Sequence, residues 1–170
     1  MPSRAEIVEA PVCQRCRLIA RLTTGSEVYR GRADLAEKPV WKCDGCDGYV
    51  GCHPGSTRAL GTPAGPDLRR ARQLLHDRMI DPLWKHADVC GEYDPEDEAA
   101  ALKIRQAARS RVYSYLADRL GKSGKDTHTG LFDLLTCRRA WRVLQGRTYA
   151  DIRAWAKARA ASKKKVKADA

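Results

Sequence analysis

The sequence has few aromatic residues and no long apolar run. Aromatic side chains make up 6% of its 170 residues, and only one of them is phenylalanine. No stretch approaches the ~18 uninterrupted apolar residues of a transmembrane helix, so a membrane-spanning protein is excluded. The first residues also lack the apolar segment of a secretory signal peptide. We therefore expect a cytoplasmic protein with no membrane partner.

The chain is too short for two full domains. It can bury one modest core, with room for a small module that a metal ion holds together. Hydrophobic residues make up 43% of the chain and charged residues 31%, which is typical of a globular protein rather than a disordered one. We expect one compact unit with an appendage.

Seven cysteines are present, and four of them form two Cys-x-x-Cys pairs. An odd count in a reducing compartment argues against a disulfide framework and favours metal ligands. The pairs are Cys13 with Cys16 and Cys43 with Cys46, separated by 26 residues. Together they supply the four thiolates of a tetrahedral structural zinc site, which has no open position for a catalytic water. The sequence therefore predicts one structural Zn²⁺ on these four cysteines.

Two further residues offer an alternative ligand set. Cys52 and His53 follow Cys46 within a few positions, and either could replace a ligand of the second pair. Cys52 is otherwise a small buried residue, and His53 otherwise belongs to a His-Pro-Gly turn. Cys90 and Cys137 lack such a partner, and Cys137 lies on an apolar helical face, where packing is the expected role.

The N-terminal third reads as a small antiparallel zinc ribbon over residues 10–55, after a flexible leader at 1–9. Residues 17–22 and 27–30 flank Thr-Thr-Gly-Ser and predict a hairpin. Apolar segments at 40–42 and 49–51 flank the second cysteine pair and predict strands on either side of it. Residues 56–66 are rich in Gly and Pro and form a connector.

The remainder predicts a helical body over residues 67–160, so the fold class is α+β. Apolar spacing predicts helices at 68–80, 96–120 and 131–144, and a fourth capped by Thr148. Pro82 should break or kink the first helix, and Gly121 should cap the second. The expected apolar faces of the second and third helices are Leu102, Ile104, Ala108, Val112, Tyr115, Leu116 and Leu120, and Leu134, Cys137, Trp141 and Leu144.

Positive charge is concentrated at the C-terminal end. The net charge is +11, and residues 138–170 carry +9 of it, including a basic, flexible tail at 161–170. A neutral body with a basic end is the electrostatic footprint of a nucleic-acid-binding protein, although a charge run can also be a solvated tail. The candidate phosphate contacts are Arg138, Arg139, Arg142, Arg153, Lys157, Lys163, Lys164, Lys165 and Lys167.

Several of these segments together resemble a known family. They are Trp-Lys-Cys-Asp-Gly-Cys at 41–46, Tyr-Val-Gly-Cys-His-Pro-Gly at 49–55, Asp-Pro-Leu-Trp at 81–84, and His-Thr-Gly-Leu-Phe-Asp at 128–133. In this respect the chain resembles a zinc-finger-containing domain of unknown function that occurs in bacterial and phage proteins. The resemblance covers most of residues 12–145 and implies the same zinc module and helical body, without a mechanism.

Three functions compete. The preferred one is a nucleic-acid-binding accessory or regulatory protein of phage origin. DNA is favoured over RNA as its partner. Trp141 and Trp155 could stack on bases or lie in the core, and the last two helices could form a helix-turn-helix. The alternative is a protein-binding adaptor or inhibitor that docks on a larger nucleic-acid-processing or defence complex.

A metal-dependent nuclease has the least support. It would use a histidine base from His53, His76 or His128, with Asp81 or Asp133 holding a second metal. The sequence contains no phosphate-binding glycine loop and no nucleophile elbow. We therefore expect a protein that is not an enzyme.

Overall fold

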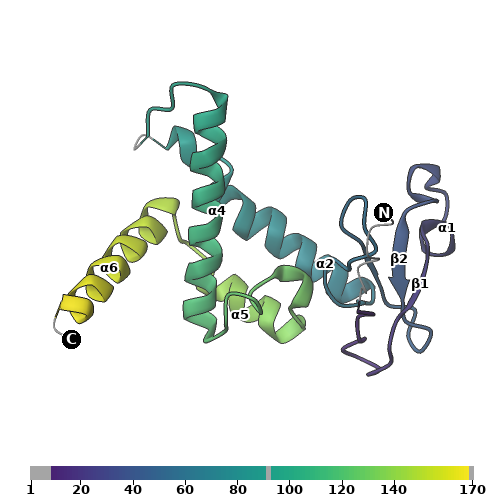
Figure 1. Ribbon diagram of the computed structural model, residues 1–170. Coiled ribbons are helices and arrows are strands. Elements are labelled where there is room, and N and C mark those ends of the chain that lie inside the picture. The colour runs from purple at the N-terminus through teal and green to yellow at the C-terminus, as the bar shows by residue number, and fades with distance from the viewer. Residues whose placement is uncertain (1–8, 91–92, 169–170) are drawn as a thin grey trace, which may run out of the picture. The chain divides into compact units, whose positions relative to one another are not determined.

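The computed structural model describes residues 9–90 and 93–168, with side chains up to residue 162. The chain divides into two compact units, one up to Arg70 and one from Ala71 onward. The first contains a small antiparallel sheet and the second is helical, which confirms the α+β class (Figure 1). The expected leader lies almost entirely outside the described residues. No helix in the described part of the chain has the length and apolarity to span a membrane.

The first unit is organised by three short strands in the order β1-β2-β3. They are β1 (Arg21–Thr24), β2 (Pro39–Lys42) and β3 (Tyr49–Gly51), and each neighbouring pair is antiparallel. The central strand buries Val40 and Trp41, and the Trp41 indole N–H donates to the Thr57 carbonyl oxygen at 2.7 Å. The two strands expected around the second cysteine pair are therefore confirmed.

The hairpin expected between residues 17–22 and 27–30 is wrong. Strand β1 pairs with β2 instead, and a single helical turn, α1 (Gly25–Val28), follows β1 directly. The Gly25 N–H donates to the Lys38 carbonyl oxygen, which folds this turn back toward β2. A 3₁₀ turn, η1 (Ala33–Leu35), lies in the connection between α1 and β2. Local β propensity at 27–30 is overridden because β2 supplies the edge that β1 needs.

A helical run that begins at the end of the first unit and enters the second continues past Pro82. It consists of α2 (Pro66–Leu75), a π-helical turn η2 (His76–Ile80), and α3 (Asp81–Trp84). The Asp81 N–H donates to the His76 carbonyl oxygen, five residues back rather than four. A proline normally breaks a helix because its ring displaces the carbonyl four residues earlier. The wider turn ahead of Pro82 absorbs that displacement, so the helix expected to end at residue 80 reaches Trp84.

The rest of the second unit is built around α4 (Glu98–Leu120). Helices α5 (Leu134–Leu144) and α6 (Tyr149–Ala168) both pack against α4 (Figure 1). Two 3₁₀ turns, η3 (Ala87–Val89) and η4 (Thr129–Leu131), lie in the connections. Gly121 ends α4 with φ 64°, as predicted. Helix α6 continues beyond residue 160, where the helical body was expected to end.

Some residues expected in the core are exposed. Leu102 on α4 is 49% exposed, and on α5 both Leu134 and Trp141 are exposed. The buried face of α5 instead carries Thr136, Cys137, Ala140 and Leu144, where small side chains allow close approach to the neighbouring helix. Trp141 follows Ala140 by one residue, which turns its side chain by ~100° away from that face.

Gly25 offers a test of the folded turn after β1. A Cβ atom at this position would lie 1.8 Å from the Leu35 carbonyl oxygen. Gly25→Ala should therefore lower the free energy of unfolding by about 1–3 kcal/mol, as overpacking does. Gly65→Ala is the matched control, because nothing lies within 4 Å of a Cβ there. Thermal unfolding of the zinc-loaded protein measures both, and equal midpoints for the two variants would contradict the close approach.

Candidate metal centre

The two cysteine pairs adopt the same backbone turn. In each, the N–H of the first cysteine donates to the carbonyl five residues later, at 2.8 Å from Cys13 to Leu18 and 2.7 Å from Cys43 to Gly48. In each, the residue after the second cysteine has a positive φ, at Arg17 and Asp47. This left-handed residue curls the chain so that both sulfurs of a pair face the same side.

The four cysteine sulfurs converge on one point. All four Sγ atoms of Cys13, Cys16, Cys43 and Cys46 lie within 4.8 Å of one another, and those of Cys13 and Cys46 are 3.6 Å apart. A tetrahedral zinc ion with Zn–S bonds of ~2.3 Å places its sulfurs ~3.8 Å apart. Cys13 and Cys43 are buried. The cluster fits one structural zinc ion, as expected.

Backbone amides surround these sulfurs. Burial raises the pKa of the Cys43 and Cys46 thiols, while the N–H groups of Gly45 and Gly48 oppose that rise. Burial also raises the pKa of Cys13, but hydrogen bonds from backbone N–H groups and from the Cys43 and Cys46 side chains together outweigh it and leave this pKa below its ordinary value. Amides directed at the sulfurs stabilise thiolates, the form that binds zinc.

The structure does not bring the alternative ligands into the cluster. The Cys52 thiol donates to the Thr57 carbonyl oxygen at 3.3 Å, and burial raises its pKa. The backbone N–H of His53 donates to the Arg58 carbonyl oxygen at 2.9 Å, as in the expected turn. Among the described residues, the cysteine cluster contains only the two Cys-x-x-Cys pairs. Cys137 is buried on α5, in agreement with a packing role.

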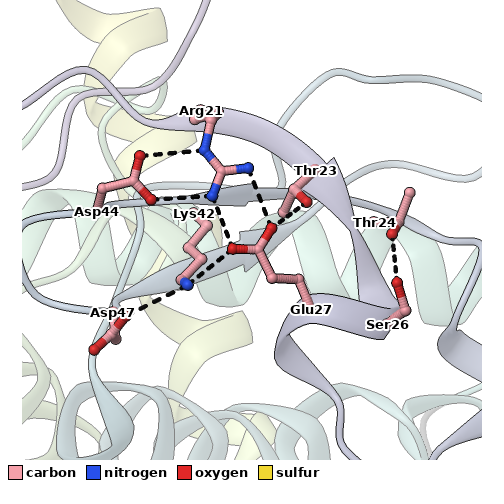
Figure 2. Close-up of polar contacts among 8 residues, drawn as sticks. All are labelled: Arg21, Thr23, Thr24, Ser26, Glu27, Lys42, Asp44 and Asp47. Carbon is pink, nitrogen blue, oxygen red and sulfur yellow. Dashed lines mark hydrogen bonds and ion pairs between the residues drawn. The ribbon is translucent and has the colours of Figure 1, made fainter.

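A polar network holds the second pair against the sheet (Figure 2). The Arg21 guanidinium on β1 donates to both carboxylate oxygens of Asp44, which lies between Cys43 and Cys46. The same guanidinium donates to both oxygens of Glu27 on α1, at 3.1 and 2.8 Å. Lys42 on β2 donates to Glu27 at 2.9 Å. The network thus ties both the edge strand and the turn after it to the zinc-binding loop.

The sequence pattern does not predict this network. Lys42 and Glu27 are 15 residues apart along the chain, and Arg21 and Asp44 are 23 residues apart. Only the pairing of β1 with β2 brings them together, whereas the sequence pattern predicts a hairpin of β1 with residues 27–30. The two strands carry only cations, Arg21 and the Lys42 paired with it, so no cross-strand pair of opposite charges signalled the network.

Comparison with known proteins agrees with this centre. A family model described as a zinc-finger-containing domain matches residues 9–98. The chain belongs to this family. The match includes all four cysteines and ends where α4 begins, so it is shorter than the expected resemblance over residues 12–145. No curated protein and no solved structure matches the chain.

The described members of the expected phosphate contacts lie in different surroundings. Arg138 and Arg142 line a cavity of about 380 Å³ on α5, together with Trp141 and Leu74. The Arg139 Nη2 atom is 3.5 Å from the Leu120 carbonyl oxygen. The Arg153 guanidinium lies 4.7 Å from the Tyr93 ring centroid. Lys157 is exposed. The side chains of Lys163, Lys164, Lys165 and Lys167 lie outside the described residues.

The π turn gathers a second group of polar side chains. His76 and Asp81 are five residues apart and would lie on different faces of an ordinary α-helix, but here the His76 Nδ1 and Asp81 carboxylate are 3.1 Å apart. Lys85 and the Trp84 indole N–H also contact this carboxylate, at 2.5 and 3.1 Å. Asp81 is thus satisfied by three donors, one of them a cation. Asp133 instead caps α5 by accepting from the Thr136 N–H.

Single substitutions test the ligand set. Cys46→Ser should reduce bound zinc from one ion per chain to none at micromolar free zinc, because three thiolates cannot close the structural tetrahedron. Cys52→Ser is the matched control and should retain one zinc. Metal analysis after gel filtration measures both variants. Loss of zinc from the Cys52 variant but not from the Cys46 variant would overturn the assignment.

The network predicts a pH dependence centred on Glu27. Hydrogen bonds from Arg21, Thr23 and Lys42 lower the pKa of Glu27 well below its ordinary value. Stability from a lowered carboxyl pKa is present above the unfolded value of about 4.3 and is lost as pH falls further. Glu27→Gln should therefore lower the unfolding midpoint at pH 7, and the difference from wild type should narrow below about pH 4.3.

The exposed Glu37 is the control for this measurement. Glu37→Gln should leave the unfolding midpoint unchanged at pH 7 and below about pH 4.3. Glu37 forms no ion pair within residues 9–90 and 93–162. A pH-independent effect of Glu27→Gln would show that the network contributes no linked protonation.

Proposed function

We propose that this protein is a nucleic-acid-binding accessory or regulatory protein. The zinc centre is the scaffold of the first unit, and the helical unit carries the contact surface. The observation that carries the proposal is the grouping of Arg138, Trp141 and Arg142 around one open cavity on α5.

The chemistry of this group suits a nucleic-acid strand. Arg138 and Arg142 are four residues apart, so their guanidinium groups lie on one face of α5 and can bind neighbouring phosphates. Neither forms an ion pair in the described part of the chain. Trp141 lies between them in sequence and is 36% exposed, which leaves indole surface for base stacking. Two free cations beside an aromatic face are the combination that strand-binding proteins use.

The second tryptophan has a different role. The Trp155 ring packs edge-on against Tyr115, with the ring centroids 5.2 Å apart, and Arg159 lies over its face. This contact joins α6 to α4 and supports a packing role for Trp155. The proposal therefore assigns base stacking to Trp141 alone.

Charge supports the same function. The C-terminal residues 138–170 carry +9 of the net +11, and such a field draws polyanions toward the helical unit. We propose DNA as the polyanion and the cytoplasm as the compartment, where the zinc ligands and the other three cysteines, all outside disulfides, can stay reduced. The phage origin stays a prediction.

A second candidate function is a protein-binding adaptor. Val12, Leu18 and Ile19 are exposed around the first cysteine pair, and Ile19 is 73% exposed. Val12 and Ile19 are partners in an antiparallel bridge, so their side chains lie on the same side of it. An exposed apolar cluster on a rigid, metal-held loop suits docking on another protein.

We do not assign an enzymatic activity. The nuclease hypothesis required a histidine beside a carboxylate that holds a metal ion. His76, Asp77 and Asp81 do lie together, but Asp81 is already in an ion pair with Lys85. The proposal is therefore a binding protein.

The salt dependence of binding tests the proposed surface. The double variant Arg138→Gln/Arg142→Gln should flatten the slope of log K against log salt by ~1.4 for single-stranded DNA, because each lost phosphate contact contributes ~0.7. Lys103→Gln is the matched control, an exposed cation on α4 away from the cavity. Fluorescence anisotropy with a labelled single strand at several salt concentrations gives the slopes.

The same titration separates the two candidates. An unchanged slope in the double variant would remove the α5 surface from DNA binding. If the wild-type protein binds no DNA at any salt concentration, the adaptor function is favoured.

A further inference from the structure

Another cavity lies between α4 and the loop that follows it. Its volume is about 390 Å³, within the ~300–1,000 Å³ range of small-molecule sites. One wall is a single face of α4 and the other is the loop at residues 124–128. The residues that define its chemistry are Arg109, Ser110, Tyr113, Lys125, Thr127 and His128.

The cavity is positively charged. Arg109 and Lys125 line it from opposite walls, and no carboxylate is among its lining residues. The Arg109 guanidinium lies 5.7 Å from the Trp84 ring centroid and 5.6 Å from that of Tyr113. Aromatic rings hold this cation in position without neutralising it, and neither cation forms an ion pair with a described residue. The site therefore favours an anion.

Tyr113 leaves a hydrogen-bonding group unsatisfied beside this cavity. Its hydroxyl is shielded from solvent and has no hydrogen-bond partner among the described residues. Buried polar groups are rarely left without a partner, because the lost hydration is not replaced. A ligand oxygen in the adjoining cavity would satisfy this hydroxyl once the Tyr113 side chain turned toward it about its Cα–Cβ bond.

The loop wall is already ordered by its own hydrogen bonds. The Thr127 hydroxyl donates to the Ser123 carbonyl oxygen at 2.7 Å, and the Ser123 hydroxyl donates to the Asp126 carboxylate at 2.6 Å. The Gly130 N–H donates to the His128 Nδ1 at 3.2 Å. Asp126, the only acid in this loop, is thus engaged within the loop. A preformed wall lowers the entropy cost of binding a ligand.

We propose that this cavity binds a nucleotide through its phosphate. Arg109 and Lys125 bind phosphate oxygens, and the Tyr113 hydroxyl donates to a phosphate or sugar oxygen. The volume exceeds what a phosphate alone occupies and leaves room for the sugar and base. The inference deepens the nucleic-acid-binding proposal and rests on it, because the nucleotide can be one unit of a bound strand. A free mononucleotide presents the same chemistry.

Calorimetry on the full-length, zinc-loaded protein tests this site with three probes: inorganic phosphate, a 5′-mononucleotide, and a single-stranded oligonucleotide of twelve thymidines. Two variants test the residues of the cavity. Tyr113→Phe removes one hydroxyl, and Arg109→Gln removes one positive charge. Lys103→Gln on the same helix is the control. Each test variant should weaken binding of the nucleotide or the oligonucleotide about 10-fold or more, as the loss of a hydrogen bond to a charged group does.

The three probes distinguish the sources of the ligand. Mononucleotide binding that depends on Tyr113 and Arg109, without oligonucleotide binding, supports the cavity and rejects the proposed function. Oligonucleotide binding that these variants weaken supports both. Oligonucleotide binding that only Arg138→Gln/Arg142→Gln weakens keeps the proposed function and overturns the cavity. The cavity proposal is also overturned if phosphate binds as tightly as the nucleotide, or if none of the three probes binds.

Discussion

The convergence of four cysteine sulfurs within 4.8 Å is the constraint on which the first unit depends. Four thiolates this close repel one another unless a cation neutralises them, and the strands around them are only three or four residues long. Such short strands bury too little apolar surface to fold alone. Zinc binding therefore supplies the folding free energy that the small core lacks, and the two identical turns prepare the sulfurs for it.

The polar network of Figure 2 extends this constraint into the sheet. Arg21 links β1 to Asp44 in the second zinc-binding turn, and Glu27 joins Arg21 to Lys42. Each pair is partly exposed and individually weak, but several charges that share partners hold one geometry better than isolated pairs do. Ile19, next to the first cysteine turn, lies outside the three strands and is exposed.

The second unit depends instead on the packing of helices around α4. Arg72 shows how its parts are joined: its buried guanidinium donates to the Phe132 carbonyl oxygen at 2.8 Å, and burial lowers the pKa of Arg72. Because the small residues of α5 face inward, its larger Trp141 faces outward beside Arg138 and Arg142. The packing that stabilises this unit therefore also produces the surface proposed for nucleic acid.

The sequence by itself determined the zinc ligands and some helix ends, because a Cys-x-x-Cys turn, the Gly121 cap of α4 and the Thr148 cap of α6 are encoded within a few neighbouring residues. Tertiary structure decided the rest. Strand β1 could pair with either of two segments, and only the path of the whole chain selected β2. The contact of His76 with Asp81 required a π turn that no periodicity shows. Which face of α5 is buried depended on the shape of α4, since packing complementarity is a property of two surfaces and not of one sequence segment.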